Sequence, residues 1–111
     1  MTKYCLYFDG KDDYVEVGYS DSLALHEFTV EVLAKALTSK LANGILGTRF
    51  GDEYTFDLKF RYTEGFHGDV GDGTKWLSTK VDWIGGIELN RYYLVHYLVQ
   101  TNKRHIRGCR I

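Results

Sequence analysis

Proline is absent from the sequence, and so is any Gly/Ser-rich linker. A chain of 111 residues is long enough to bury one hydrophobic core and short for two. We therefore expect a single domain that spans residues 1–111.

The sequence also lacks an excess of charge of either sign, because 14 basic residues nearly balance 15 acidic ones for a net charge of −1. This balance argues against the basic surfaces of nucleic-acid-binding and polybasic membrane-binding proteins. No run approaches the roughly 20 apolar residues of a membrane-spanning helix, and Met1–Lys3 leads into a predicted strand rather than into a signal peptide. We expect no nucleic-acid partner and no membrane association. The chain as given would be cytoplasmic, or extracellular if it belongs to a longer precursor.

Cysteine occurs only twice, as Cys5 and Cys109. A bridge between them would close a loop of ~100 residues and contribute roughly 4.7 kcal/mol on the chain-entropy model. Without an export signal, two free thiols are the favoured interpretation. Neither Cys-x-x-Cys nor His-x-x-x-His spacing occurs, so no zinc site is predicted.

Aromatic residues, in contrast, make up 15% of the sequence, and their alternating positions are typical of a β-sandwich interior. Alternation of period two predicts strands at 4–8, 14–17 and 27–36, with a turn at 9–13 between the first two. We expect Gly10 to have a positive φ in this turn, so that Gly10→Val would destabilise the protein by ~1 to 2 kcal/mol.

The alternating pattern continues to the C-terminus. It predicts further strands at 45–50, 54–62, 65–70, 76–83, 92–100 and 105–111, with a turn at 51–53. Residues 37–42 carry helical spacing and are assigned to a short helical turn or loop. The strand at 54–62 has an apolar face and a polar one: Tyr54, Phe56, Leu58 and Phe60 against Thr55, Asp57, Lys59 and Arg61.

Two groups of residues carry a family resemblance. The first comprises Leu6–Gly10, Asp12–Val15, Ser22-Leu23 and Phe28–Glu31, and the second comprises Gly71–Gly73, Trp76, Leu89-Asn90 and Tyr92–Tyr97. In this order they resemble the laminin-G-like, concanavalin A-like jelly-roll domains of the lectin and glucanase type. The resemblance implies an all-β fold, an antiparallel two-sheet β-sandwich. Family members continue with closing strands after the segment that matches 103–108, so we expect the sandwich in abbreviated form.

The acidic residues do not form a catalytic pair. Glucanase relatives of this fold carry carboxylates at alternate strand positions, and retaining hydrolysis needs two carboxyl groups about 5 to 5.5 Å apart. Glu53 and Asp57 share a strand face but lie ~13 Å apart, and Asp57 alone is interpreted as a solvated strand residue. None of the four histidines belongs to a nucleophile motif, and His96 is interpreted as a core or inter-sheet histidine. We predict that the chain is not an enzyme, with glycoside hydrolysis as a third hypothesis that Asp57-dependent turnover would support.

Predicted loops and strand ends hold the candidate ligand-binding residues. Sugar-binding surfaces stack rings on pyranose faces, and the candidates for such stacking are Tyr19, Trp76, Trp83, Tyr92 and Tyr93. Related domains hold calcium through oxygen ligands; Asp69, Asp72 and Asn90 are the metal candidates, and Asp9, Asp12 and Asp13 are further oxygen donors. Ring packing and turn formation are the competing explanations. Calcium is the only cofactor left open.

Together these patterns predict a non-catalytic, lectin-like binding module for a carbohydrate or another small polar ligand. The alternative is a self-assembling protein-interaction module, because a sandwich without closing strands exposes an edge. The predicted edge strand Tyr4–Phe8 has no charge, so we expect it to pair with another chain more readily than the C-terminal strand. That strand carries Lys103, Arg104, Arg107 and Arg110. We therefore expect a two-fold homodimer with residues 4–8, or the sheet face beside them, in the interface.

Overall fold

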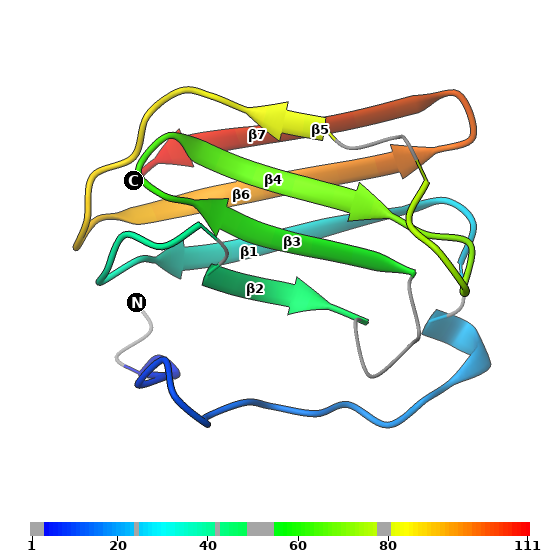
Figure 1. Ribbon diagram of the computed structural model, residues 1–111, viewed down its shortest axis with the longest axis horizontal. Coiled ribbons are helices and arrows are strands. Elements are labelled where there is room, and N and C mark those ends of the chain that lie inside the picture. Colours follow the sequence, from blue (N-terminus) through cyan, green and yellow to red (C-terminus); the bar gives the residue numbers. More distant parts are fainter. Residues whose placement is uncertain (1–3, 24, 42, 49–54, 78–80) are drawn as a thin grey trace.

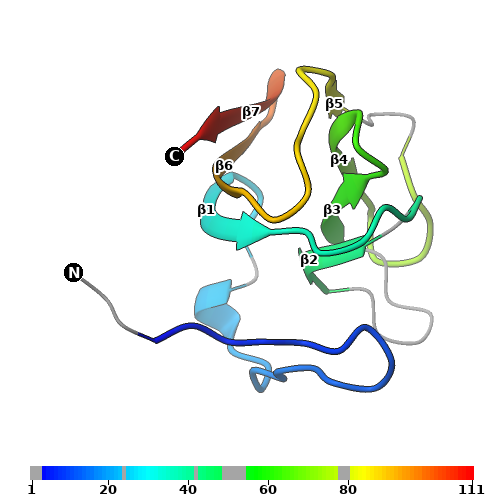
Figure 2. The same cartoon turned by 90° about the vertical axis from the view of Figure 1, so that its left-hand side faces the viewer.

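The computed structural model describes residues 4–23, 25–41, 43–48, 55–77 and 81–111. Within them, strands form two antiparallel sheets that pack face to face (Figures 1 and 2). The predicted all-β, antiparallel two-sheet sandwich is confirmed. Sheet A has the strand order β1-β6-β7, and sheet B has the order β2-β3-β4-β5. The bounds are β1 Phe28–Lys35, β2 Asn43–Gly47, β3 Phe56–Arg61, β4 Gly65–Val70, β5 Val81–Trp83, β6 Tyr92–Gln100 and β7 Lys103–Arg110.

The core lies between the sheets and is built from alternate side chains of their strands. Along β1, half-buried and exposed residues alternate over the whole strand, as expected when one sheet face is covered and the other is solvated. The buried apolar residues are Ala36, Leu58, Phe60, Phe66, Ile87, Tyr93, Val95, Tyr97, Val99 and Ile106. Removal of these side chains from water is the main stabilising contribution, at about 25 cal/mol per Å².

Several strands lie where they are predicted. β4 and β6 occupy 65–70 and 92–100, and β1 lies within 27–36. Residues 37–41 form a loop that contains no helix. The predicted turn at 51–53 and parts of the predicted strands at 45–50, 54–62 and 76–83 lie outside the described residues.

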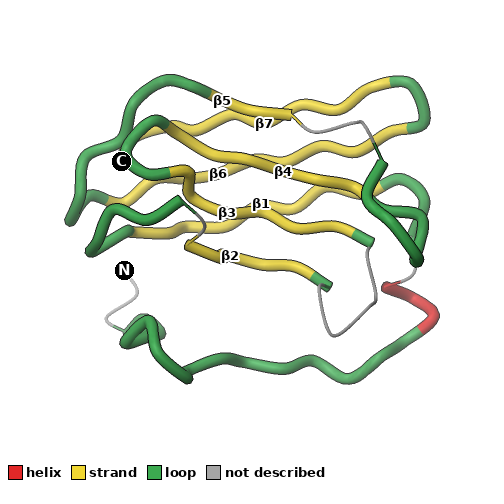
Figure 3. The backbone as a smooth tube through the Cα atoms, in the orientation of Figure 1, coloured by secondary structure: helices red, strands yellow, loops and turns green. Residues whose placement is uncertain are grey.

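The predicted N-terminal hairpin is wrong. Residues 4–20 contain no strand and run beneath the edges of β1 and β2 before the 3₁₀ helix η1, Asp21–Leu23 (Figures 1 and 3). The turn itself is formed, because Gly10 has φ +77° and the Asp9 carboxylate accepts a hydrogen bond from the Lys11 N–H at 2.8 Å. Apolar residues on both sides of this turn, such as Tyr4 and Val17, stay exposed. Alternation buries a strand face only where a facing layer covers it.

The outer face of sheet A corrects the interpretation of His96. This residue does not enter the core, because the alternation of β6 places it on the solvent side. Its Nδ1 lies 3.0 Å from Oε1 of Glu31, which is its partner in the neighbouring strand.

Cys5 and Cys109 are both free thiols and both exposed. A hydrogen bond between the Cys5 thiol and Tyr92 raises the pKa of the Tyr92 hydroxyl above its ordinary value.

Candidate functional site

A pocket of about 500 Å³ opens at the end of the sandwich where the chain passes from β5 to β6. This connection, residues 84–91, crosses the end of the two sheets in Figure 2. We call the cavity the Trp83 pocket, and its lining residues are Trp83, Gly85, Gly86, Ile87, Glu88, Tyr93, Gly108 and Arg110. A volume between roughly 300 and 1,000 Å³ is typical of sites for small ligands.

Backbone hydrogen bonds fix the connection that forms one wall of this pocket. The N–H of Gly86 donates to the Glu64 carbonyl at 2.8 Å, and the N–H of Ile87 donates to the Thr63 carbonyl at 2.9 Å. Gly86 has φ +76°, a conformation that glycine adopts without steric cost. The wall is therefore attached to the turn between β3 and β4.

The Trp83 ring forms the apolar wall of the pocket. One side of it stacks on Phe66, with ring centroids 5.5 Å apart and an interplanar angle of 28°. A Cβ atom at Gly85 would lie 2.1 Å from the Trp83 ring, and one at Gly108 would lie 2.9 Å from it. The sequence places the two glycines where the indole needs the space, and the ring is held between the sheets and the connection.

Polar groups surround this aromatic wall. The buried Tyr93 hydroxyl accepts a hydrogen bond from the Glu88 N–H at 2.8 Å, and a phenol that accepts one such bond can still donate its own proton. At the rim, Nη1 of Arg110 lies 3.3 Å from the Glu88 carboxylate, and Nε of Arg91 lies 3.3 Å from the same carboxylate. The side chains of Glu88 and Arg110 are 58% and 51% exposed. An acceptor and a donor therefore stand beside an aromatic surface, within reach of solvent.

A second polar surface, on the outer face of sheet B, is an ion-pair network. The Lys59 ammonium lies 3.2 Å from the Asp57 carboxylate and 3.5 Å from the Asp69 carboxylate. His67 stands between two acids, with Nε2 at 2.9 Å from Asp69 and Nδ1 hydrogen-bonded to Asp82. Strand register explains this arrangement, because Asp57 faces Asp69, Lys59 faces His67, and His67 faces Asp82.

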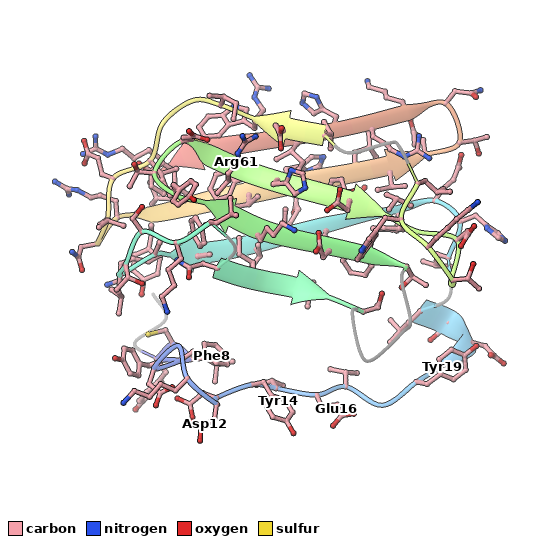
Figure 4. The ribbon with its side chains drawn as sticks, in the orientation of Figure 1. Phe8, Asp12, Tyr14, Glu16, Tyr19 and Arg61 are labelled. Atoms are coloured by element: carbon pink, nitrogen blue, oxygen red, sulfur yellow. The ribbon has the colours of Figure 1, made fainter. Side chains whose placement is uncertain are left out.

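Arg61, which Figure 4 labels at the upper part of this face, extends the network. Its guanidinium lies 3.0 Å from Asp82 and 3.1 Å from Glu64. The register sets Asp57 opposite Asp69, and like charges in this position destabilise a sheet. The contacts of Lys59 and His67 with these carboxylates offset that repulsion and the lost hydration of the covered acids. We interpret the network as a structural feature of sheet B.

The network also corrects the interpretation of Asp57. Only 8% of this residue is exposed. β2 pairs beside it, with Gly47 opposite, and the Lys59 ammonium lies 3.2 Å from its carboxylate. Between the two sheets, burial raises the pKa of the Tyr97 hydroxyl of β6 far above its ordinary value, and the charge of Asp69 in β4 adds to this rise.

The structure brings together two of the five predicted sugar-binding rings. Trp83 and Tyr93 both line the pocket. Tyr92 lies on the outer face of sheet A, where Lys35 Nζ is 4.8 Å from its ring centroid. Trp76 forms a bridge with Gly71 in the loop after β4, and Figure 4 shows Tyr19 on the N-terminal segment beneath the sheets.

The predicted metal candidates do not converge on one point. The Asp69 carboxylate belongs to the network on sheet B. The loop that holds Asp72 and the loop that holds Asn90 lie at opposite ends of the strands (Figure 1). Hydrogen bonds from the Thr74 and Lys75 N–H groups lower the pKa of Asp72, which gives this residue a turn-capping role.

The acidic turn near the N-terminus gathers three carboxylates. One oxygen each from Asp9, Asp12 and Asp13 lies within 4.8 Å of the others, and all three residues are exposed. The Asp13 carboxylate already accepts a hydrogen bond from the Asp9 N–H at 3.0 Å. Acidic residues are frequent in turns for this conformational reason.

Sequence reasoning missed Glu88 and Arg110 as pocket residues. Both lie in segments that read as a turn and as a solvated edge strand, and their pairing depends on the path of the connection over the sheet ends. The signal that points to this place is the Gly85-Gly86 pair, which follows Trp83 after one intervening residue, since adjacent glycines permit close approach to a ring.

Comparisons with protein-family models, with curated proteins and with solved structures found no match for this chain. Among the described residues, no helix has the length and apolar character needed to cross a membrane.

Proposed function

We propose that the chain is a non-catalytic, lectin-like binding module of the laminin-G-like, concanavalin A-like kind, and that the Trp83 pocket holds its ligand. The observation that carries this proposal is the chemistry of the lining, an aromatic wall beside a carboxylate, a guanidinium and a phenol. The family assignment itself rests on the sequence motifs and on a fold-level analogy.

A carbohydrate suits this combination of groups. Its C–H face packs against an aromatic ring, while its hydroxyl groups donate to a carboxylate and accept from a guanidinium. Arg110 and Arg91 each lie 3.3 Å from the Glu88 carboxylate, so the rim offers an acceptor and guanidinium donors side by side to the hydroxyl groups of a ligand. The part of the Trp83 ring that lines the pocket would supply the apolar contact, and Glu88, Tyr93 and Arg110 would bind the hydroxyl groups.

Calorimetric titration with a panel of neutral mono- and oligosaccharides, with and without calcium, tests the proposal. Glu88→Gln and Arg110→Gln each remove a charged hydrogen-bonding group, so we expect affinity to fall by about 10- to 100-fold. Arg107→Gln is the matched control, because it makes the same change in the same strand at an exposed residue outside the pocket lining. Its affinity should stay that of the wild type.

Two results would contradict the proposal. No heat of binding for any saccharide in either buffer would remove the carbohydrate function. Binding that is equally strong in the wild type, Glu88→Gln and Arg110→Gln would place the ligand away from the Trp83 pocket.

A further inference from the structure

The edge of β1 is the longest weakly charged sheet edge in the described part of the molecule. β1 is at the end of the order β1-β6-β7, so it pairs on one side only, over eight residues. The other outer strands are poorer templates for pairing. β5 has three residues, β2 has five with a register shift, and β7 carries the basic residues Lys103, Arg104, Arg107 and Arg110.

Charge protects β7 from pairing with another chain, as natural edge strands commonly require. β1 has no such protection, because Glu31 and Lys35 are its only charged residues. These two have opposite signs, lie on the same exposed face, and are equally spaced about Leu33. A strand with this pattern is complementary to an antiparallel copy of itself.

We propose that two copies of this chain associate through antiparallel pairing of their β1 strands, with Leu33 on the two-fold axis. In this register Leu33 faces Leu33 of the second copy, and Glu31 faces Lys35 of the second copy on both sides of the axis. Moving the axis to Glu31 or to Lys35 would place like charges opposite each other, which destabilises a strand pair. Only the register about Leu33 satisfies both charges.

The neighbouring strand β6 already supports each of these side chains. His96 lies beside Glu31 with Nδ1 at 3.0 Å from its carboxylate, and Lys35 lies over the Tyr92 ring. Pairing would extend each contact into a row across the dimer, His96–Glu31–Lys35–Tyr92, in which the last two residues belong to the second copy. Opposite charges that face each other across strands favour pairing.

Apolar surface on the same face points to the same axis. Leu33 and its β6 partner Leu94 are 56% and 40% exposed. At the axis Leu33 would meet Leu33 of the second copy, with one Leu94 beside each of them. On the inner face, Val32 would face Ala34 of the second copy, so the core would continue from one sandwich into the next.

Residues 4–23 lie beneath this edge and would have to move aside. Their side-chain hydrogen bonds connect neighbours within the segment, such as Asp9 with Asp13 and Tyr19 with Asp21. At the beginning of the segment, Cys5 lies near Tyr92 of β6. Displacing the remainder therefore costs few interactions with the sheets.

Charge exchange at β1 tests the register. In sedimentation velocity over the micromolar range, we expect the wild-type full chain to reach twice the chain mass of 12.8 kDa. Glu31→Lys and Lys35→Glu should each raise the dimer dissociation constant by about tenfold, because two opposite-charge pairs become two like-charge pairs. The double variant Glu31→Lys/Lys35→Glu restores opposite charges in trans and should return the dissociation constant to near the wild-type value.

Arg107→Glu is the control, because it makes a comparable charge change on the other edge strand of sheet A and should leave association unchanged. Circular dichroism of every variant checks that the sandwich is retained. A wild-type chain that stays monomeric, or a double variant no better than the single ones, would overturn the proposal. Loss of the dimer in Tyr7→Lys together with an unchanged dimer in Glu31→Lys would also overturn it, and would move the interface to residues 4–8.

Discussion

Gly68 lies where side chains of the facing sheet approach the backbone closely, and adding one methyl group there should destabilise the protein. A Cβ atom at Gly68 would lie 2.8 Å from Cζ of Tyr97 and 2.9 Å from Cδ1 of Ile106. Carbon atoms in contact are about 3.5 to 4.0 Å apart, so both neighbours would have to retreat by about 0.6 Å or more. Neither can do so freely, since Tyr97 is 0% and Ile106 is 3% exposed. We expect Gly68→Ala to lower the free energy of unfolding by about 2 to 3 kcal/mol, towards the upper end for overpacking.

Gly44→Ala is the matched control for this substitution. A Cβ atom at Gly44, in β2 of the same sheet, meets nothing within 4 Å. Both variants restrict the unfolded chain in the same way, an effect of about 0.4 to 1 kcal/mol in favour of alanine. The difference between Gly68→Ala and Gly44→Ala therefore isolates the steric cost at Gly68.

Urea denaturation measures that difference, with all variants at one protein concentration because self-association stabilises by mass action. Ile106→Val removes Cδ1, one of the two obstructing atoms, and costs about 0.5 to 1.5 kcal/mol alone. Combined with Gly68→Ala it should cost less than the sum of the two single changes, with a coupling of at least about 0.5 kcal/mol. Equal unfolding midpoints for Gly68→Ala and Gly44→Ala would refute the reasoning.

Two further predictions concern acid stability and the N-terminal turn. The N–H and the hydroxyl of Thr101 donate to Glu27 and lower its pKa from the ordinary 4.5, so its contribution is present above that pH and is lost as pH falls through the lowered pKa. In Glu27→Gln, Tm should fall less steeply than in the wild type as the pH is lowered below about 4.5. The same dependence of Tm on pH in both proteins would contradict this. Gly10→Val places a β-branched residue at φ +77°, but residues 9–13 lie outside the sheets, so we expect faster amide exchange there and a change in unfolding free energy under ~0.5 kcal/mol. A loss of ~1 to 2 kcal/mol would instead place this turn in the cooperative unit.

A difference in polarity between the two faces of a strand is one signal that located strands well. β3 carries Phe56, Leu58 and Phe60 on one face and charged residues on the other, and this contrast fixes both the strand and its orientation. In the N-terminal segment the same contrast failed. Alternation at 4–8 and 14–17 states which face a strand would bury, but it contains no information on whether a neighbouring sheet edge is available.

The candidate site was predictable only in part, for a related reason. Trp83 and Tyr93 could be named because large rings near strand ends are informative by themselves. Glu88 and Arg110 acquire their place from a tertiary path, the crossing of residues 84–91 over the sheet ends. From its own strand Asp57 is predicted to be solvated, but in the fold it is covered, with β2 paired beside it and Lys59 3.2 Å from its carboxylate.

The strand orders of the two sheets separate the two proposed activities in space. β5 and β7 lie at one side of the sandwich, and the Trp83 pocket opens beside them. β1 and β2 lie at the opposite side (Figure 1), so pairing through β1 would leave both pockets of a dimer open. A ligand that binds monomer and dimer equally well cannot shift their equilibrium. The dimer can still bind a polymeric ligand more tightly than the monomer, because the second pocket then binds at the effective concentration set by the first. The pocket and the self-complementary edge of β1 lie on opposite sides of the sandwich, so dimerisation does not obstruct ligand binding and can strengthen the binding of a polymeric ligand.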